Sequence, residues 1–317
     1  MATAAKTATK TATKTENELS ARERKLQVRF IRISNWLKEI CLGMGDTITP
    51  AIVALLAKEH CLLIGPPGEG KTMLAKLIAN SVKDADIYYK QWHPQTDTDE
   101  IFNIPSAEKL AQGLVERNLT GTLAACHVAV VDELYKAMPD AHATVFTVLQ
   151  ERVFVNGTRE IAIPLNTCYG LSNEIDREVA GFNERFAIKV MVPPATREVR
   201  KQIMLNENDG TAMLTIPEKE KTCLAELAAA QHSISKMRLS ENQIDRLLAI
   251  AAAMEVSTDV NSRQLRKLVN LVKAYAWYGQ SETYDVADKY LEIAQFAFWQ
   301  DESDYEACMS VMDKHLA

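Results

Sequence analysis

Short apolar runs alternate with helically spaced apolar residues over the first two thirds of the chain. The helical stretches, with apolar residues three and four apart, cover residues 18–42, 49–60, 71–82 and 139–153. The apolar runs, predicted as strands, are "CLLI" (61–64), "IYYKQW" (87–92), "HVAVVDE" (127–133), "TCYGLSNE" (167–174) and "NERFAIKV" (183–190). Strands that alternate with helices predict a parallel sheet covered by helices on both faces.

Three further local signals refine this pattern. Thr49 and Pro50 predict that the second helix starts there, with proline in its first turn. "VFVNGTREIAI" (153–163) carries Asn156 and Gly157 between two alternating segments, which is a strong hairpin signal. "GLVERNLTGTLAA" (113–125) predicts a second, weaker hairpin.

The pattern changes after Pro193 and Pro194, where helical spacing alone continues. The helical segments cover residues 198–208, 221–237, 241–256, 262–279 and 285–299. We therefore expect a nucleotide-binding core over 23–194 and a helical domain over 195–317. Residues 1–22 begin with an Ala, Thr and Lys repeat that offers almost nothing to bury, so we expect a disordered tail.

Composition narrows the classes of function. The 317 residues are 47% hydrophobic and 25% charged, which is typical of a soluble globular protein. A net charge of -6 gives no overall basic field, which disfavours charge-driven binding to nucleic acid. The six cysteines form no CxxC pair, and no apolar run is long enough to cross a bilayer. We expect a cytoplasmic protein.

The strongest chemical signal is "GPPGEGKT", which lies between a predicted strand and a predicted helix. Its glycines let backbone N–H groups face phosphates, Lys71 reaches the β and γ oxygens, and Thr72 coordinates Mg²⁺. The predicted binding residues for ATP are Gly65, Pro66, Pro67, Gly68, Glu69, Gly70, Lys71, Thr72 and Met73.

Acidic residues follow the buried run "VAVVDE". Asp132 and Glu133 stand at the carboxyl end of a predicted strand, where ligands bind in an open parallel sheet. We expect Asp132 to hold Mg²⁺ and Glu133 to polarise the attacking water, which favours hydrolysis over phosphoryl transfer to a substrate hydroxyl.

Two polar residues lie near the ends of later predicted strands. Asn173 in "GLSNE" is expected to hold the same water or the γ-phosphate. Arg185 in "FNERF" is far from the phosphate loop in sequence, and an arginine directed at a neighbouring subunit's γ-phosphate would neutralise transition-state charge.

The order "GPPGEGKT", "VAVVDE", "GLSNE", "NERF" and "NSRQL" resembles the Walker A, Walker B, sensor 1, arginine finger and sensor 2 of an AAA+ ATPase. "VDELYKAMPDAHATVFTVLQERVFVNG" and "QWHPQTDTDEIF" are similar to the MoxR family, and within it to the RavA-like subfamily. The resemblance implies a P-loop NTPase αβα core followed by an all-α lid.

Carried onto this sequence, the resemblance makes Glu133, Asn173, Arg185, Arg263 and Lys71 the catalytic residues. Arg185 would act in a neighbouring subunit, and Arg263 would be the lid arginine on the γ-phosphate. Arg152 is a second candidate for action across the interface. The hairpin at Asn156 and Gly157 would point toward the pore of a ring or its face.

The resemblance also implies a homo-oligomeric ring, expected to be a hexamer, that uses ATP and Mg²⁺ as a chaperone-like remodeller. Its partner would be a protein with a von Willebrand factor A (vWA) domain. RavA-like proteins carry extra C-terminal domains, so here we expect the ring, its inserts or the basic tail to contact that partner. Two alternatives remain: a nucleic-acid-dependent AAA+ motor or loader, and a monomeric nucleotide-gated scaffold or small-molecule kinase.

Overall fold

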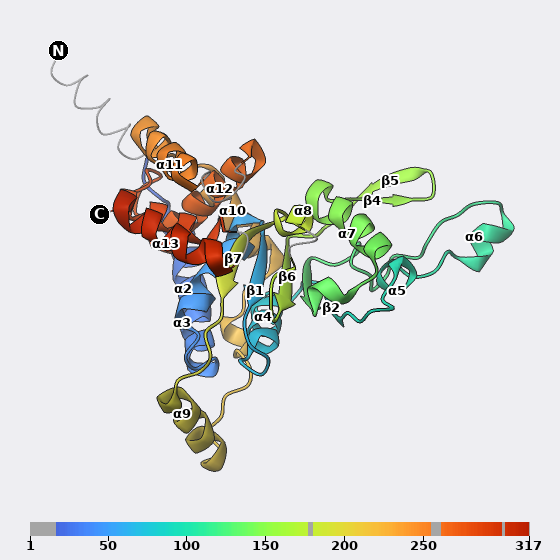
Figure 1. Ribbon diagram of the computed structural model, residues 1–317, viewed down its shortest axis with the longest axis horizontal. Coiled ribbons are helices and arrows are strands. Elements are labelled where there is room, and N and C mark those ends of the chain that lie inside the picture. The colour runs from blue at the N-terminus through green and yellow to red at the C-terminus, as the bar shows by residue number, and fades with distance from the viewer. Residues whose placement is uncertain (1–16, 177–179, 255–260, 300–301, 317) are drawn as a thin grey trace.

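Five parallel strands form the central sheet of the computed structural model, which describes residues 17–176, 180–254, 261–299 and 302–316. The strand order is β2-β3-β6-β1-β7 (Figure 1). The strands are β1 (His60–Ile64), β2 (Ile87–Gln91), β3 (Val128–Asp132), β6 (Thr167–Ser172) and β7 (Phe186–Met191). Strands β1 and β6 are buried along their whole length, as expected for a sheet with two covered faces.

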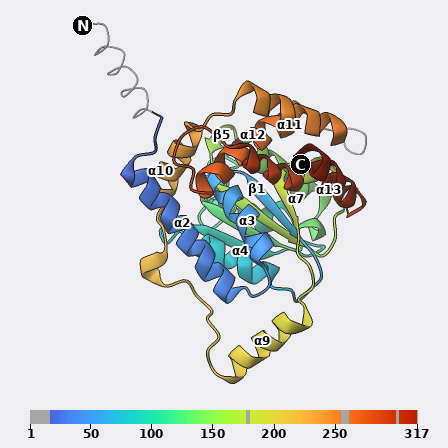
Figure 2. The ribbon, with the colours of Figure 1, turned by 90° about the vertical axis from the view of Figure 1, so that its left-hand side faces the viewer.

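Helices cover both faces of the sheet, which confirms the predicted α/β fold. On one face α3 contacts β1 and β7, and α4 contacts β2, β3 and β6; Figure 2 shows them in front of the sheet, with α7 behind. On the other face the Phe182 ring of α8 packs against His142 of α7 and against Phe186 of β7. The helices of this part are α2 (Ala21–Ile40), α3 (Gly45–Ala57), α4 (Lys71–Asn80), α5 (Thr98–Phe102), α6 (Ala107–Ala111), the 3-10 helix η1 (Leu134–Lys136), α7 (Pro139–Glu151) and α8 (Ala180–Asn183).

Two segments project together from the core beyond α5 and α7 (Figure 1). One is the predicted hairpin, confirmed as β4 (Val153–Asn156) paired with β5 (Arg159–Ala162). The other is the loop that carries α6. The Asn156 side chain joins them, because it accepts a hydrogen bond from Arg117 N (2.7 Å) and donates one to Arg117 O (3.0 Å).

Helices make up most of the chain after β7. They are α9 (Arg197–Asn208), η2 (Glu218–Glu220), α10 (Leu224–Ser235), α11 (Glu241–Met254), α12 (Ser262–Tyr278), the 3-10 helix η3 (Asp288–Phe296) and α13 (Glu302–Leu316). Helix α12 packs on α3, and η3 contacts β7, while α9 extends away from the rest (Figures 1 and 2). None of the helices in the described part of the chain is long and apolar enough for a membrane crossing.

Part of the predicted tail is built into the fold. Leu19 is buried, its N–H donates to Glu282 O, and Ser20 with Glu23 forms a capping box that starts α2. Residues 1–16 of that tail lie outside the described residues.

The structure corrects three local predictions. Residues 113–125 form no hairpin: Thr122 and Ala125 instead bond to carbonyls three residues back, and Arg117 pairs with Pro105 and Asn156. Helix α3 begins at Gly45 rather than at Thr49, so Pro50 lies inside it and removes only one helical hydrogen bond. Residues 288–296 form a 3-10 helix rather than the α-helix that their spacing suggests.

Candidate nucleotide site

The segment "GPPGEGKT" forms the turn between β1 and α4, as its sequence predicts. Gly65 follows β1 where the chain runs close to β7, and a Cβ at this position would lie 2.3 Å from Val192 O. Gly70 has φ +82° and precedes the first residue of α4, a conformation that favours glycine. The loop therefore ends on a helix N-terminus, where free N–H groups and the helix dipole attract anions.

Lys71 folds back over this loop. Its amine donates to Gly65 O, to Pro66 O (2.8 Å) and to Asn173 Oδ1 (3.2 Å). Burial lowers the pKa of Lys71, while the nearby carboxylates of Asp132 and Glu133 act in the opposite direction. The predicted sensor Asn173 and the predicted phosphate-binding lysine therefore lie together.

Thr72 and Asp132 also meet. The Thr72 hydroxyl donates to Asp132 Oδ2 at 2.8 Å, which joins the start of α4 to the end of β3. A hydroxyl and a carboxylate oxygen are the hard ligands that Mg²⁺ prefers, so the residues present fit this ion. Glu133 follows in the left-handed region (φ +54°), which is uncommon for a residue with a side chain and turns it away from the strand direction.

The other loop residues divide into two kinds. Pro66 lines a large cavity, and Glu69 faces the chain after β7, where it accepts a hydrogen bond from Ala195 N (2.8 Å) and pairs with Arg200 (3.3 Å). Pro67 and Gly68 are exposed at the tip of the loop, and Met73 on α4 is 39% exposed.

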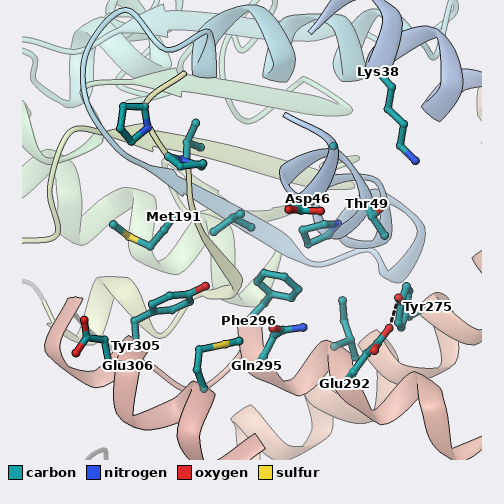
Figure 3. A pocket seen from close by; sticks show the side chains of 18 of the residues that line it. Lys38, Asp46, Thr49, Met191, Tyr275, Glu292, Gln295, Phe296, Tyr305 and Glu306 are labelled. Atoms are coloured by element: carbon teal, nitrogen blue, oxygen red, sulfur yellow. Dashed lines mark hydrogen bonds between the residues drawn. The ribbon is translucent and has the colours of Figure 1, made fainter. Parts of the chain in front are cut away.

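The cavity beside Pro66 has a volume of about 1110 Å³. Figure 3 shows Asp46 and Thr49 of α3 on one side and Phe296 and Tyr305 on the other. The Tyr275 hydroxyl donates to Glu292 at one end of this space. Its polar rim and aromatic residues, next to the phosphate loop, suit the base and sugar of a nucleotide.

Arg185 and Arg263 are not brought to the phosphate loop of their own chain. Arg185 directly precedes β7, and Arg263 of α12 donates to Gln150 Oε1 (2.9 Å) at the end of α7. Arg263 lines a cavity with Glu59 and His60, where β1 begins. The phosphate loop follows the other end of β1, roughly 15 Å away for a five-residue strand.

Arg152 lines the same cavity as Arg263, but its guanidinium is used within the chain. It donates to the carbonyls of Leu165, Asn166 and Lys58. Burial lowers the pKa of Arg152, and the nearby Glu59 carboxylate opposes this shift.

Two contacts near Glu133 were not predicted from the sequence. Lys136 lies 3.3 Å from Glu133 Oε2, and the Tyr135 hydroxyl donates to Asn183 Oδ1 at 2.6 Å. The acid, the tyrosine and the lysine all stand in "DELYK", so the lysine pair was visible as an i,i+3 spacing. The contact with Asn183 depends on the fold.

The sheet order, the phosphate loop after β1 and the acids after β3 define a P-loop nucleotide-binding protein with the AAA+ αβα core. Comparisons with known proteins give the family. Residues 29–232 match the model of the MoxR domain in the MoxR-vWA-beta-propeller ternary systems. The chain belongs to this MoxR family.

The chain is also similar to curated proteins and to a solved structure. An uncharacterized protein of Methanocaldococcus jannaschii is 27% identical over 86% of this chain and 72% of its own length. Protein MoxR of Paracoccus denitrificans is 24% identical over 76% of this chain and 79% of its own length. A crystal structure of a candidate ATPase from Cytophaga hutchinsonii matches with a TM-score of 0.73 at 14% identity, covering 93% of this chain and 95% of the other, which supports the fold alone.

Proposed function

We propose that this chain is an ATPase that forms a ring, expected to be a hexamer, and remodels a partner protein. One observation carries the proposal: Lys71, Thr72, Asp132, Glu133 and Asn173 lie together where β1, β3 and β6 end. This set contains a phosphate-binding cation, a pair of Mg²⁺ ligands and an acid beyond them, which is what hydrolysis of a nucleoside triphosphate requires.

Each residue of this set has a distinct role in the proposal. Lys71 and the loop N–H groups bind the phosphates of ATP, and Thr72 with Asp132 holds Mg²⁺. Mg²⁺, when bound, neutralises charge on the phosphate oxygens. Glu133 accepts a proton from the attacking water, and Asn173 orients that water or the γ-phosphate.

The cationic residues at the other end of the sheet support assembly. Arg185 and Arg263 lie at the amino end, where they cannot serve the phosphate loop that follows β1 of the same chain. Both would reach a phosphate only if a second copy placed its loop against this end. Repetition of this head-to-tail contact generates a ring when the rotation closes.

The family match is the basis for the proposed partner. The matched model is described as part of MoxR-vWA-beta-propeller systems, so we propose a protein with a vWA domain as the partner and a chaperone-like action on it. The projecting β4-β5 hairpin and α6 loop are the surfaces we assign to that contact. Membership of the RavA-like subfamily remains a prediction from the sequence.

Light scattering of the purified chain, with and without ATP, tests this proposal together with an ATPase assay. We expect Glu133→Gln to assemble into a closed ring with ATP, and the specific activity of the natural chain to rise with protein concentration. Lys71→Ala should neither bind ATP nor assemble, while Lys76→Ala, on the same helix with its amine over the Tyr89 ring, should do both. A strict monomer with full ATPase activity would contradict the proposal.

A further inference from the structure

Helix α12 holds the backbone of the predicted arginine finger through Lys267. The Lys267 amine donates to Glu184 O and to Arg185 O, both at 2.9 Å. Lys267 lies one helical turn after Arg263 on α12. The helix that carries Arg263 is therefore hydrogen-bonded to the backbone of Arg185, the other arginine proposed to act in trans.

The two guanidinium groups also rest on one helix. The Arg185 guanidinium donates to Gly181 O (2.6 Å) and lies 4.0 Å from the centre of the Phe146 ring. Arg263 donates to Gln150, which is four residues after Phe146 on α7. Residues four apart share one face of a helix, so both arginines sit side by side on α7.

Lys267 occupies this position at an electrostatic cost. Burial lowers the pKa of Lys267 to about 8; Arg185, Arg263 and Arg152 lower it as well, while Glu59 acts in the opposite direction. Lys189, which is itself fully buried, also lies close enough for the two amines to repel each other. A cation among so many others is costly for folding, and such local conflicts are typical of functional positions.

We propose that Lys267 is a positioning residue, which fixes residues 184 and 185 to α12 so that Arg185 and Arg263 are presented to the neighbouring nucleotide as one unit. This rests on the proposed function, because the arginines need a second copy in order to act. The contact spans 82 residues of sequence and joins the segment before β7 to the helical part of the chain.

A donor and recipient assay tests this role. The recipient is Arg185→Ala, which keeps its own nucleotide site but lacks the finger. The donor is Glu133→Gln, which supplies Arg185 but does not hydrolyse ATP itself. We expect this donor to restore hydrolysis to the recipient, and a donor that also carries Lys267→Met to restore about tenfold to hundredfold less.

Three controls separate positioning from general damage. A Glu133→Gln donor with Lys267→Arg should restore most of the turnover, because a guanidinium can also donate to two carbonyls. A donor with Lys273→Met, on the same helix, should act like the parent donor. The loss should appear in kcat of the recipient and leave its KM unchanged, since the recipient's own phosphate loop is intact. Ring mass with ATP should stay constant.

The outcomes are distinct. If the Lys267→Met donor restores turnover as fully as the parent donor, the positioning role is wrong. If Lys267→Met fails to fold, Lys267→Leu, which also has no donor, replaces it, and full restoration by that donor would equally overturn the role. If the parent Glu133→Gln donor restores nothing, the trans arrangement of the proposed function fails, and this inference fails with it.

Discussion

In the proposed function, the two ends of the parallel sheet supply opposite halves of a nucleotide site. At the carboxyl end, Lys71 bonds to Asn173 and Thr72 bonds to Asp132 within one chain. At the amino end, Arg152, Arg263 and Lys267 line one cavity together with the carboxylates of Glu59 and Glu151. Arg185 stands beside them and lies 3.8 Å from Glu184. Burial lowers the pKa of Arg185, and Arg263 contributes to this shift.

The comparison shows that positive and negative side chains are balanced at the carboxyl end of the sheet, whereas positive side chains are in excess at the amino end. Cations held close to one another destabilise a monomer, but they match the phosphates that the carboxyl end of a second copy would present. The predictions below test whether the two ends are parts of one site.

Glu133→Gln is expected to have the largest effect on turnover among changes that preserve binding. The amide keeps the shape of the side chain but accepts no proton, so hydrolysis should fall by about 10² to 10⁴. Titration with a fluorescent ATP analogue should give an unchanged affinity. Loss of affinity equal to the loss of turnover would mean that Glu133 binds nucleotide rather than acting on water.

Arg185→Ala should come next, because it removes a cation from the other end of the sheet while the phosphate loop stays intact. We expect kcat to fall by about 10³, the low end of the range for arginine fingers, with ATP still bound. Steady-state kinetics give both values. Arg263→Ala should have a smaller effect in the same direction, and the exposed Arg266→Ala on the same helix should have none.

Tyr135→Phe is a smaller change, and it tests whether the carboxyl end and the amino end of the sheet are coupled within one chain. The hydroxyl joins the predicted Walker B segment to Asn183, two residues before Arg185, and burial raises the pKa of Tyr135. Removing one hydrogen bond costs about 1 kcal/mol. We expect turnover to fall a few-fold and the Hill coefficient for ATP to move toward one. An unchanged Hill coefficient would exclude this link.

Lys189→Met should change stability and leave turnover as it is. Lys189 is fully buried in β7, its amine has no hydrogen-bond partner among the described residues, and burial lowers its pKa to about 8 from the usual 10.5. The unfolded chain therefore binds more protons between pH 8 and 10.5, and stability rises with pH in this window.

The size of this effect follows from the same pKa values. A pKa of about 8 against 10.5 corresponds to about 3 kcal/mol of destabilisation at pH 7, which Lys189→Met should remove. Denaturant unfolding at pH 7 and pH 10 measures both the gain and the flatter pH dependence. Because the pKa of Lys267 is also near 8, the free energy of unfolding of the variant should still depend on pH, though less steeply. A less stable Lys189→Met would show that the amine has a partner.

The sequence predicts the carboxyl end of the sheet well, because its chemistry is local. "GPPGEGKT" and "VAVVDE" identify their residues within short segments whose strand and turn context is visible. The structure joins Thr72 to Asp132, the two residues that the sequence predicts as Mg²⁺ ligands. The hairpin was predicted from Asn156 and Gly157, but Asn156 is the last residue of β4 and pairs with Arg159, so the turn lies at Gly157 and Thr158. Of these residues Gly157 has the positive φ (+66°) that favours glycine.

The amino end could not be predicted in the same way. The bonds from Lys267 to residues 184 and 185 depend on how α12 packs against the segment before β7, and nothing in "SRQLRKL" indicates them. The location of Arg263 away from its own phosphate loop is likewise a property of packing. Residues 113–125 were misread because their partners are Pro105 and Asn156, which lie outside the segment.

The central claim is that one active site takes residues from two chains, and mixing two inactive variants tests it most directly. Arg185→Ala keeps its phosphate loop and Glu133→Gln keeps its arginines, so each alone should hydrolyse ATP very slowly. Mixed in varying proportion, they should regain turnover with a maximum at intermediate mole fractions, because only mixed neighbours form a complete site. Activity that never exceeds the sum of the two separate variants would contradict the account.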